Sequence, residues 1–166
     1  HAAAETFIVS EAVIRFLAAR LLTLRELAAQ HNVPVPLDLA FHPGMGLRDA
    51  LSRFQFTLSL LQDPATVRRV ASEMCEDAAR EGVTTLEIRF GPQLHSGGLE
   101  RVIDAAIEGA AGRAGIVLCA LYGEPPEVAE AMVRAAMHRK GVVGLDLAGG
   151  PTGDHTFRLR DYAPAF

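Results

Sequence analysis

Residues 85–92 read Thr-Leu-Glu-Ile-Arg-Phe-Gly-Pro, and residues 142–150 read Val-Val-Gly-Leu-Asp-Leu-Ala-Gly-Gly. Each stretch predicts a short strand that carries charge and follows an amphipathic helix. Successive side chains of a strand point to opposite faces, so Glu87 and Arg89 share one face, and Asp146 lies opposite the leucines of its strand. Strands fed by helices form parallel sheets covered on both sides, where charges need partners. We therefore expect a structural ion network of Glu87, Arg89 and Asp146 in the lumen of a β/α barrel, near the face where such barrels do chemistry.

The second half of the chain alternates between strand and helix patterns at about 30 residues per unit, which is typical of right-handed parallel β/α units. The predicted strands cover 83–90, 116–122 and 142–148. The helices between them cover 99–113 and 126–140, and another helix is expected to begin near Leu159. Upstream, helices are predicted over 6–30 (with a break near Arg20, or a short strand within 6–10), over 47–61 on a stripe with Leu51 and Phe54, and over 64–81 after an Asp63 cap.

The length of the chain conflicts with a complete barrel. Eight β/α units usually need about 250 residues, and this sequence has 166. The predicted fold class is therefore α/β, with the parallel β/α units of a TIM-type barrel that is incomplete, extra N-terminal helices, and a single domain over 1–166. Either the chain is part of a longer barrel, or the open sheet edges are covered by the apolar N-terminal helix or by a second copy in a homo-oligomer.

Composition excludes some classes of partner. The formal net charge is −4, so no basic surplus exists to neutralise the phosphates of a nucleic acid. No stretch reaches the roughly 18 apolar residues of a membrane span, so no membrane partner is expected. Cys75 and Cys119 stand among apolar residues and are predicted to be small buried hydrophobes, which favours a reducing, cytoplasmic setting.

Several segments together resemble one family. In order along the chain these are Asp-Pro-Ala-Thr-Val at 63–67, Ala-Ala-Arg-Glu-Gly-Val at 78–83, Glu-Ile-Arg-Phe-Gly-Pro at 87–92 and Gly-Val-Val-Gly-Leu-Asp-Leu-Ala-Gly at 141–149. Their order and spacing are similar to the second β/α unit and the fourth strand of adenosine deaminases. Residues 24–28 and 33–36 resemble the helix and turn that follow the family's first strand.

The resemblance implies a zinc-dependent aminohydrolase on a (β/α)8 barrel, in which a metal-bound water attacks the amino-bearing carbon of a purine. It implies zinc as the cofactor and adenosine, adenine or a related aminopurine as the small-molecule substrate. Two substrate-binding positions carry over to this sequence. Gly149 matches the glycine whose backbone N–H contacts the purine, and Phe54 matches an aromatic residue of the helix that covers the pocket.

The family's metal ligands and proton-transfer residues do not carry over. Its His-x-His motif falls on Ala12 and Ile14, which cannot bind zinc, and the acidic residue and glycine that follow fall on Phe16 and Leu17. His-Ala-Gly-Glu, a later histidine and paired aspartates are not found. Three hypotheses stay open: a part of an active deaminase, a catalytically inactive deaminase-like protein that binds a ligand, or a protein that self-assembles through its N-terminal helix.

Less specific interpretations compete at the other polar residues. The charges in the strands are more typical of structure than of catalysis. The histidines show no metal-ligand spacing, and His95, just after a strand, is the best placed of them. Asp154 and His155 read as a solvated loop, and Phe54 as core packing if it does not line a pocket.

Overall fold

The computed structural model describes residues 20–36, 39, 42–149 and 156–166. The expected helix over 6–19, with Ala12 and Ile14, lies outside these residues, as do Asp154 and His155. In chain order the described elements are α2 (Leu21–Gln30), α3 (Leu47–Leu60), α4 (Pro64–Arg80), β1 (Glu87–Phe90), η1 (Pro92–Leu94), α5 (Leu99–Ala110), β2 (Gly115–Leu121), α6 (Pro126–Ala136), β3 (Val142–Ala148), η2 (Leu159–Asp161) and η3 (Ala163–Ala165), where η marks a 3-10 turn.

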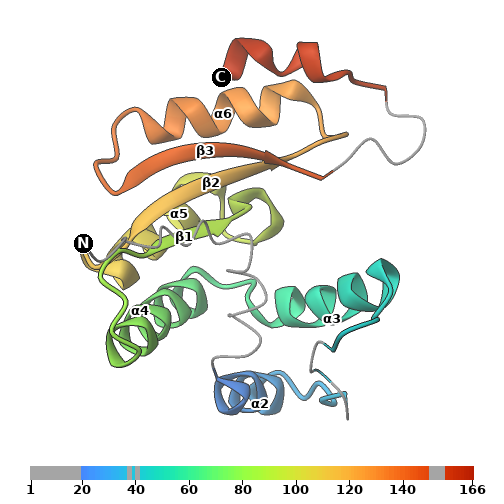
Figure 1. Cartoon of the computed structure of the whole chain (residues 1–166), viewed down its shortest axis with the longest axis vertical. Helices are drawn as coiled ribbons and strands as arrows, with labels where there is room; N and C mark the ends of the chain where they lie inside the picture. Colours follow the sequence, from blue (N-terminus) through green and yellow to red (C-terminus); the bar gives the residue numbers. More distant parts are fainter. Residues whose placement is uncertain (1–19, 37–38, 40–41, 150–155) are drawn as a thin grey trace.

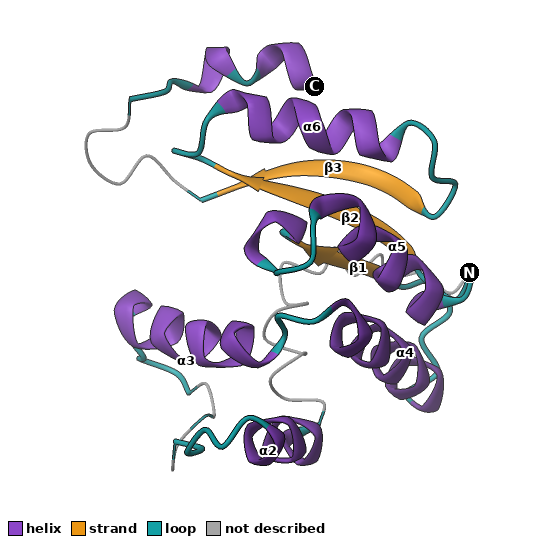
Figure 2. Cartoon of the chain, turned by 180° about the vertical axis from the view of Figure 1, so that it is seen from behind, coloured by secondary structure: helices purple, strands orange, loops and turns teal. Residues whose placement is uncertain are grey.

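The three strands form one parallel sheet in the order β1-β2-β3. Ile88 pairs in register with Ile116, and Leu118 pairs with Leu145. Figure 1 shows α5 behind the sheet and α6 beside β3, and Figure 2 shows α5 from the other side, in front of β1 and β2. The predicted parallel β/α units are confirmed, and within the described residues they make up part of a barrel rather than a closed one.

The core lies between the sheet and the helices that follow its strands. Ile88, Ile116 and Leu118 are almost completely buried. The buried stripe of α4 is Val67, Val70, Ala71, Met74, Cys75 and Ala78, the spacing expected of a helix with one apolar face. Cys75 and Cys119 are both buried, as predicted.

Helices α4 and α5 pack closely because α5 carries a glycine at the crossing. A Cβ built on Gly109 would lie 2.2 Å from the carbonyl oxygen of Arg68 and 2.9 Å from the Cβ of Ala71. No side chain fits at such a distance, so the sequence permits this approach only with glycine at 109. The close packing fixes the two helices that lie next to β1.

Helix ends follow local chemistry. Asp63 caps α4 by accepting a hydrogen bond from the backbone N–H of Ala65 at 2.8 Å, and Pro64 occupies the first turn, as predicted. α5 ends before the predicted position 113, because Ala111 and Gly112 take positive φ values of 49° and 74°. The helix expected near Leu159 is instead a pair of 3-10 turns.

Two further expectations need correction. β1 begins at Glu87 rather than at 83, and the residues just before it contribute one ladder contact, a hydrogen bond from the N–H of Gly115 to the carbonyl of Leu86 at 3.0 Å. Leu51, placed on the apolar stripe of α3, is 49% exposed. The buried positions of that helix are Thr57 and Leu60 instead.

The C-terminal segment is anchored on the carboxyl end of β2. Tyr162 is 1% exposed. Its hydroxyl donates to the carbonyl of Glu124 at 2.6 Å and accepts from the N–H of Gly123 at 2.8 Å. Figure 1 shows this segment in red beside α6. Of the helices that the structure describes, none has the length and apolar character needed to cross a membrane.

Candidate functional site

An ion pair joins the outer strands of the sheet. The guanidinium of Arg89 on β1 donates to a carboxylate oxygen of Asp146 on β3. Cys119 of β2 lies between them, with its Sγ 3.7 Å from the Asp146 carboxylate. The two charged side chains are 28% and 34% exposed, so the pair is half-buried rather than enclosed. Two of the three residues of the predicted network therefore meet.

Glu87 stands apart from this pair. Its side chain is half-buried on β1, and its carboxylate forms no ion pair or hydrogen bond with any residue that the structure describes. The predicted network is thus a pair, Arg89 with Asp146, in the described part of the chain.

The thiol of Cys119 is expected to be unreactive at this position. Burial raises the pKa of its thiol to about 11, and the neighbouring Asp146 carboxylate adds to the effect while Arg89 opposes it. The reactive form of cysteine is the thiolate. Cys119 therefore remains a neutral thiol near pH 7 and does not act as a nucleophile.

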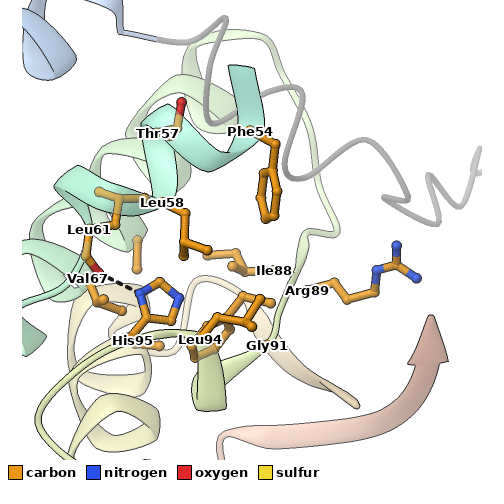
Figure 3. A pocket seen from close by; sticks show the side chains of 13 residues that line it. Phe54, Thr57, Leu58, Leu61, Val67, Ile88, Arg89, Gly91, Leu94 and His95 are labelled. Atoms are coloured by element: carbon orange, nitrogen blue, oxygen red, sulfur yellow. Dashed lines mark hydrogen bonds between the residues drawn. The ribbon is translucent and has the colours of Figure 1, made fainter. Parts of the chain in front are cut away.

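A largely apolar pocket opens between α3 and the carboxyl end of β1 (Figure 3). Its volume is about 50 Å³. In Figure 3 the ring of Phe54 points into the pocket toward Ile88, and Arg89 extends from its rim toward β3. Phe54 thus lines a pocket, as the family position predicts. The remaining wall is formed by Thr57, Leu58, Leu61, Val67, Ala71, Ile88, Phe90, Gly91, Leu94, His95 and Ala106.

His95 is a polar residue in the wall of this pocket, and its contacts were not predicted from the sequence. Its Nδ1 is hydrogen-bonded to the carbonyl oxygen of Leu61, and its ring meets Phe90 edge-on, with the ring centroids 5.6 Å apart. Burial lowers the pKa of His95 below its ordinary value. The sequence showed no metal-ligand spacing at this histidine, and the structure gives a neutral, hydrogen-bonding residue of an apolar pocket.

Gly149 lies at the other side of the sheet, just after β3. Its φ is +87°, which favours glycine. A Cβ there would lie 3.8 Å from the backbone nitrogen of Tyr122, whose N–H donates to the carbonyl of Ala148 at 2.8 Å. Gly149 does not line the pocket that contains Phe54. Among the described residues, the two predicted substrate-binding positions, Phe54 on α3 and Gly149 after β3, do not line one cavity.

A hydrogen-bonded group at the carboxyl ends of β1 and β2 was missed from the sequence. The side-chain amide of Gln93 donates to the carboxylate of Glu124 at 2.9 Å and to the carbonyl of Cys119 at 3.3 Å. The same carboxylate accepts from the N–H of Leu121 at 3.1 Å. Gln93 Oε1 is buried without a partner in the described structure. The one feature of the sequence that could have indicated this group is the position of Gln93, directly after the Gly-Pro that ends the strand.

The described residues do not fit a zinc site. Among residues 20–36, 39, 42–149 and 156–166, no three histidine, cysteine, aspartate or glutamate side chains gather in a group that could hold a metal ion. Zinc sites need three or four such ligands.

Parallel strands followed by helices, with polar side chains and a glycine turn at the carboxyl ends of the strands, define a chain of the β/α-barrel class. The sequence model of the adenosine deaminase family matches residues 18–166. The chain belongs to the adenosine deaminase family.

Individual relatives agree with this assignment. The chain is 36% identical, over 168 residues, to a probable adenosine deaminase from Dictyostelium discoideum; the match covers 89% of this chain and 21% of that protein. It is 37% identical, over 161 residues, to an adenosine deaminase from Mycolicibacterium vanbaalenii, with 79% of this chain and 43% of that protein covered. The chain therefore spans less than half the length of these relatives.

Solved structures show the same fold. An N6-methyl-AMP deaminase from Arabidopsis thaliana superposes with a TM-score of 0.69 at 26% identity, covering 87% of this chain and 48% of that one. An amidohydrolase from Burkholderia ambifaria with bound zinc superposes with a TM-score of 0.72 at 20% identity, covering 98% of this chain and 52% of that one. The second likeness concerns the fold alone.

Proposed function

We propose that this protein takes part in the hydrolytic removal of an amino group from adenosine, adenine or a related aminopurine. The observation that carries the proposal is the family match over residues 18–166, which includes both the β/α units and the carboxyl-end turns of their strands. The relatives named as adenosine deaminases support adenosine as a substrate. The structural neighbour named as an N6-methyl-AMP deaminase supports a wider range of aminopurines.

In this proposal the described residues bind and orient the purine. The apolar wall with Phe54 packs against an aromatic ring and excludes water from it. The backbone N–H of Gly149, which has no side chain to keep a ligand away, donates a hydrogen bond to the purine. The ion pair of Arg89 and Asp146 holds β1 and β3 at a fixed spacing across β2. It therefore fixes the turn with Gly149, after β3, relative to the carboxyl end of β1, which forms part of the pocket with Phe54.

Zinc is the cofactor that the family implies, and one structural neighbour contains it. Bound zinc supplies a hydroxide-like water at neutral pH. Because the described residues of this chain form no metal site, we assign no step of the reaction to zinc held by them. In the proposed reaction the ligands come from outside the described residues.

A deamination assay tests the proposal. The full-length product of the gene that encodes this chain is incubated with adenosine, adenine and N6-methyl-AMP, with and without added zinc, and products are separated by chromatography. The proposal predicts loss of the amino group from at least one of these compounds, abolished by a chelator. No product from any of them, under conditions in which a full-length relative is active, would contradict it.

One observation favours a second function, that of a deaminase-like protein that binds a ligand or self-assembles without catalysis. The resemblance places the family's zinc-binding histidines at Ala12 and Ile14, which cannot bind zinc, and the described residues offer no substitute. Metal analysis and light scattering separate the two. Stoichiometric zinc supports the enzyme, whereas a metal-free oligomer dissociated by Ile14→Glu or Phe16→Glu supports assembly through the N-terminal segment. The two buried, unpaired cysteines favour a cytoplasmic setting for either function.

A further inference from the structure

One side chain in the wall of the pocket uses only half of its hydrogen-bonding capacity. The Nδ1 atom of His95 is bonded to the carbonyl oxygen of Leu61. A carbonyl oxygen only accepts, so Nδ1 carries the hydrogen, and the neutral ring keeps a lone pair on Nε2. In Figure 3 this second nitrogen is on the side of the ring away from Leu61, near Leu58 and Leu94.

The Nε2 atom is open to the pocket. It has no hydrogen-bond partner among the described residues. Gln93 Oε1 also lacks a hydrogen-bond partner among the described residues, but that atom is buried from solvent. His95 Nε2 is not among the buried atoms without a partner. Burial of the ring lowers the pKa of His95, so at pH 7 Nε2 presents an acceptor rather than a donor.

The other polar groups of the wall are already engaged. The hydroxyl of Thr57 donates to the carbonyl of Arg53 within α3 at 3.3 Å. The guanidinium of Arg89 is paired with Asp146 and extends toward β3. The remaining described lining residues contribute apolar side chains or backbone. A ligand in this pocket therefore meets an apolar wall with one free acceptor.

We propose that His95 is the specificity-determining residue of this pocket, and that it selects a small aromatic ring bearing an N–H or O–H donor over an equal-sized ring without one. A donor-bearing ring satisfies Nε2. A ring without a donor removes water from Nε2 and leaves it unpaired, which costs binding free energy.

The size of the pocket sets the class of ligand. Its volume of about 50 Å³ is above the roughly 10–15 Å³ that one water needs and below the roughly 150 Å³ of a cavity that encloses benzene. The pocket therefore accepts one edge of a single ring, and the donor on that edge is the group that reaches Nε2. The inference rests on the proposed function in one respect, since it takes this pocket as the place where an aromatic ring of the substrate enters. Amino groups and ring N–H groups of aminopurines are donors of the required kind.

The test uses phenol and toluene, which have the same shape and differ in the donor. Their dissociation constants are measured by calorimetry for the complete chain and for His95→Asn. The asparagine amide can still donate to Leu61 but has nothing at the position of Nε2. We expect the preference for phenol, taken as the ratio of the toluene constant to the phenol constant, to fall about fivefold in His95→Asn, the loss typical of one net hydrogen bond.

Thr57→Val is the matched control, because it removes a hydroxyl that is already bonded within its helix. Its ratio should equal that of the unchanged chain. A second measurement needs no variant: phenol, but not toluene, should shift the ¹⁵N resonance of His95 Nε2. This keeps the inference testable if His95→Asn does not fold.

Equal ratios in the unchanged chain and in His95→Asn, an unmoved Nε2 resonance, or failure of both probes to bind would each overturn the role of His95. The deamination assay is separate. If phenol binds with the expected preference while no aminopurine is deaminated, the role of His95 stands and the proposed function fails.

Discussion

Arg89 and Asp146 form an ion pair that reaches from β1 to β3 across the middle strand. The pair passes beside Cys119 and lies close to the turns that begin at Gly91 and Gly149. It ties together two β/α units that are 57 residues apart in the sequence. The structure thus links the two edges of the sheet through side chains as well as through the hydrogen-bonded ladder.

Breaking the pair should destabilise the fold moderately. Fully buried pairs lose about 3–5 kcal/mol when one partner is removed, and exposed pairs contribute about 0–1 kcal/mol. Because both side chains are partly exposed, we expect Asp146→Asn to lower the free energy of unfolding by about 1–2 kcal/mol in urea denaturation. Glu87→Gln on β1, the strand that carries Arg89, is the control and should have little effect. A loss of equal size in the control would show that the pairing is not the cause.

Gly109→Ala should be among the more damaging substitutions in the chain. The added Cβ would meet the Arg68 carbonyl at 2.2 Å, so α4 and α5 must move apart. We expect a loss of about 2–3 kcal/mol, the upper part of the range of about 1–3 kcal/mol for overpacking. Gly144→Ala is the matched control, since its Cβ would meet Val117 at an ordinary 3.6 Å. Equal melting temperatures for the two variants would contradict the packing described.

Tyr162→Phe should loosen the C-terminal segment without changing the sheet. The variant leaves the N–H of Gly123 and the carbonyl of Glu124 without the partner seen here. We expect a loss of about 1–2 kcal/mol, together with faster proteolysis within residues 156–166. Unchanged proteolysis would mean that the hydroxyl does not anchor the segment.

His95 should titrate below its ordinary pKa of 6.5, because burial disfavours the charged ring. A group whose pKa is lower in the folded state binds protons more readily when unfolded. Its contribution to stability is therefore present above the unfolded pKa and is lost as the pH falls from about 6.5 toward the folded pKa. NMR titration of the ring should show the lowered value. A pKa of His95 at or above 6.5 would contradict the burial.

The strands and their order were predictable because their signal is local. Alternating side chains and the glycine that follows each strand identify β1 and β3, and Asp63-Pro64 marks the start of α4. The parallel arrangement then follows from helices of suitable length between the strands.

The site was less predictable, because it depends on contacts between distant parts of the chain. Nothing near His95 in the sequence indicates that its partner would be a carbonyl 34 residues earlier, at Leu61. Glu87 and Arg89 look equivalent in the strand pattern, but only the longer arginine side chain is paired with β3 in the described structure. No sequence pattern marks Tyr162. Its role depends on a hydrogen bond from the backbone N–H of Gly123, which is distant in the sequence.

Purine binding at the turn after β3 tests the central claim most directly. Adenosine is titrated into the chain, into Gly149→Val, and into Gly82→Val, a control that has a similar positive φ of 75° but lies in the loop after α4. Adenosine should bind to the unchanged chain and to Gly82→Val but not to Gly149→Val. No binding to the unchanged chain, or equal binding to all three, would contradict the account.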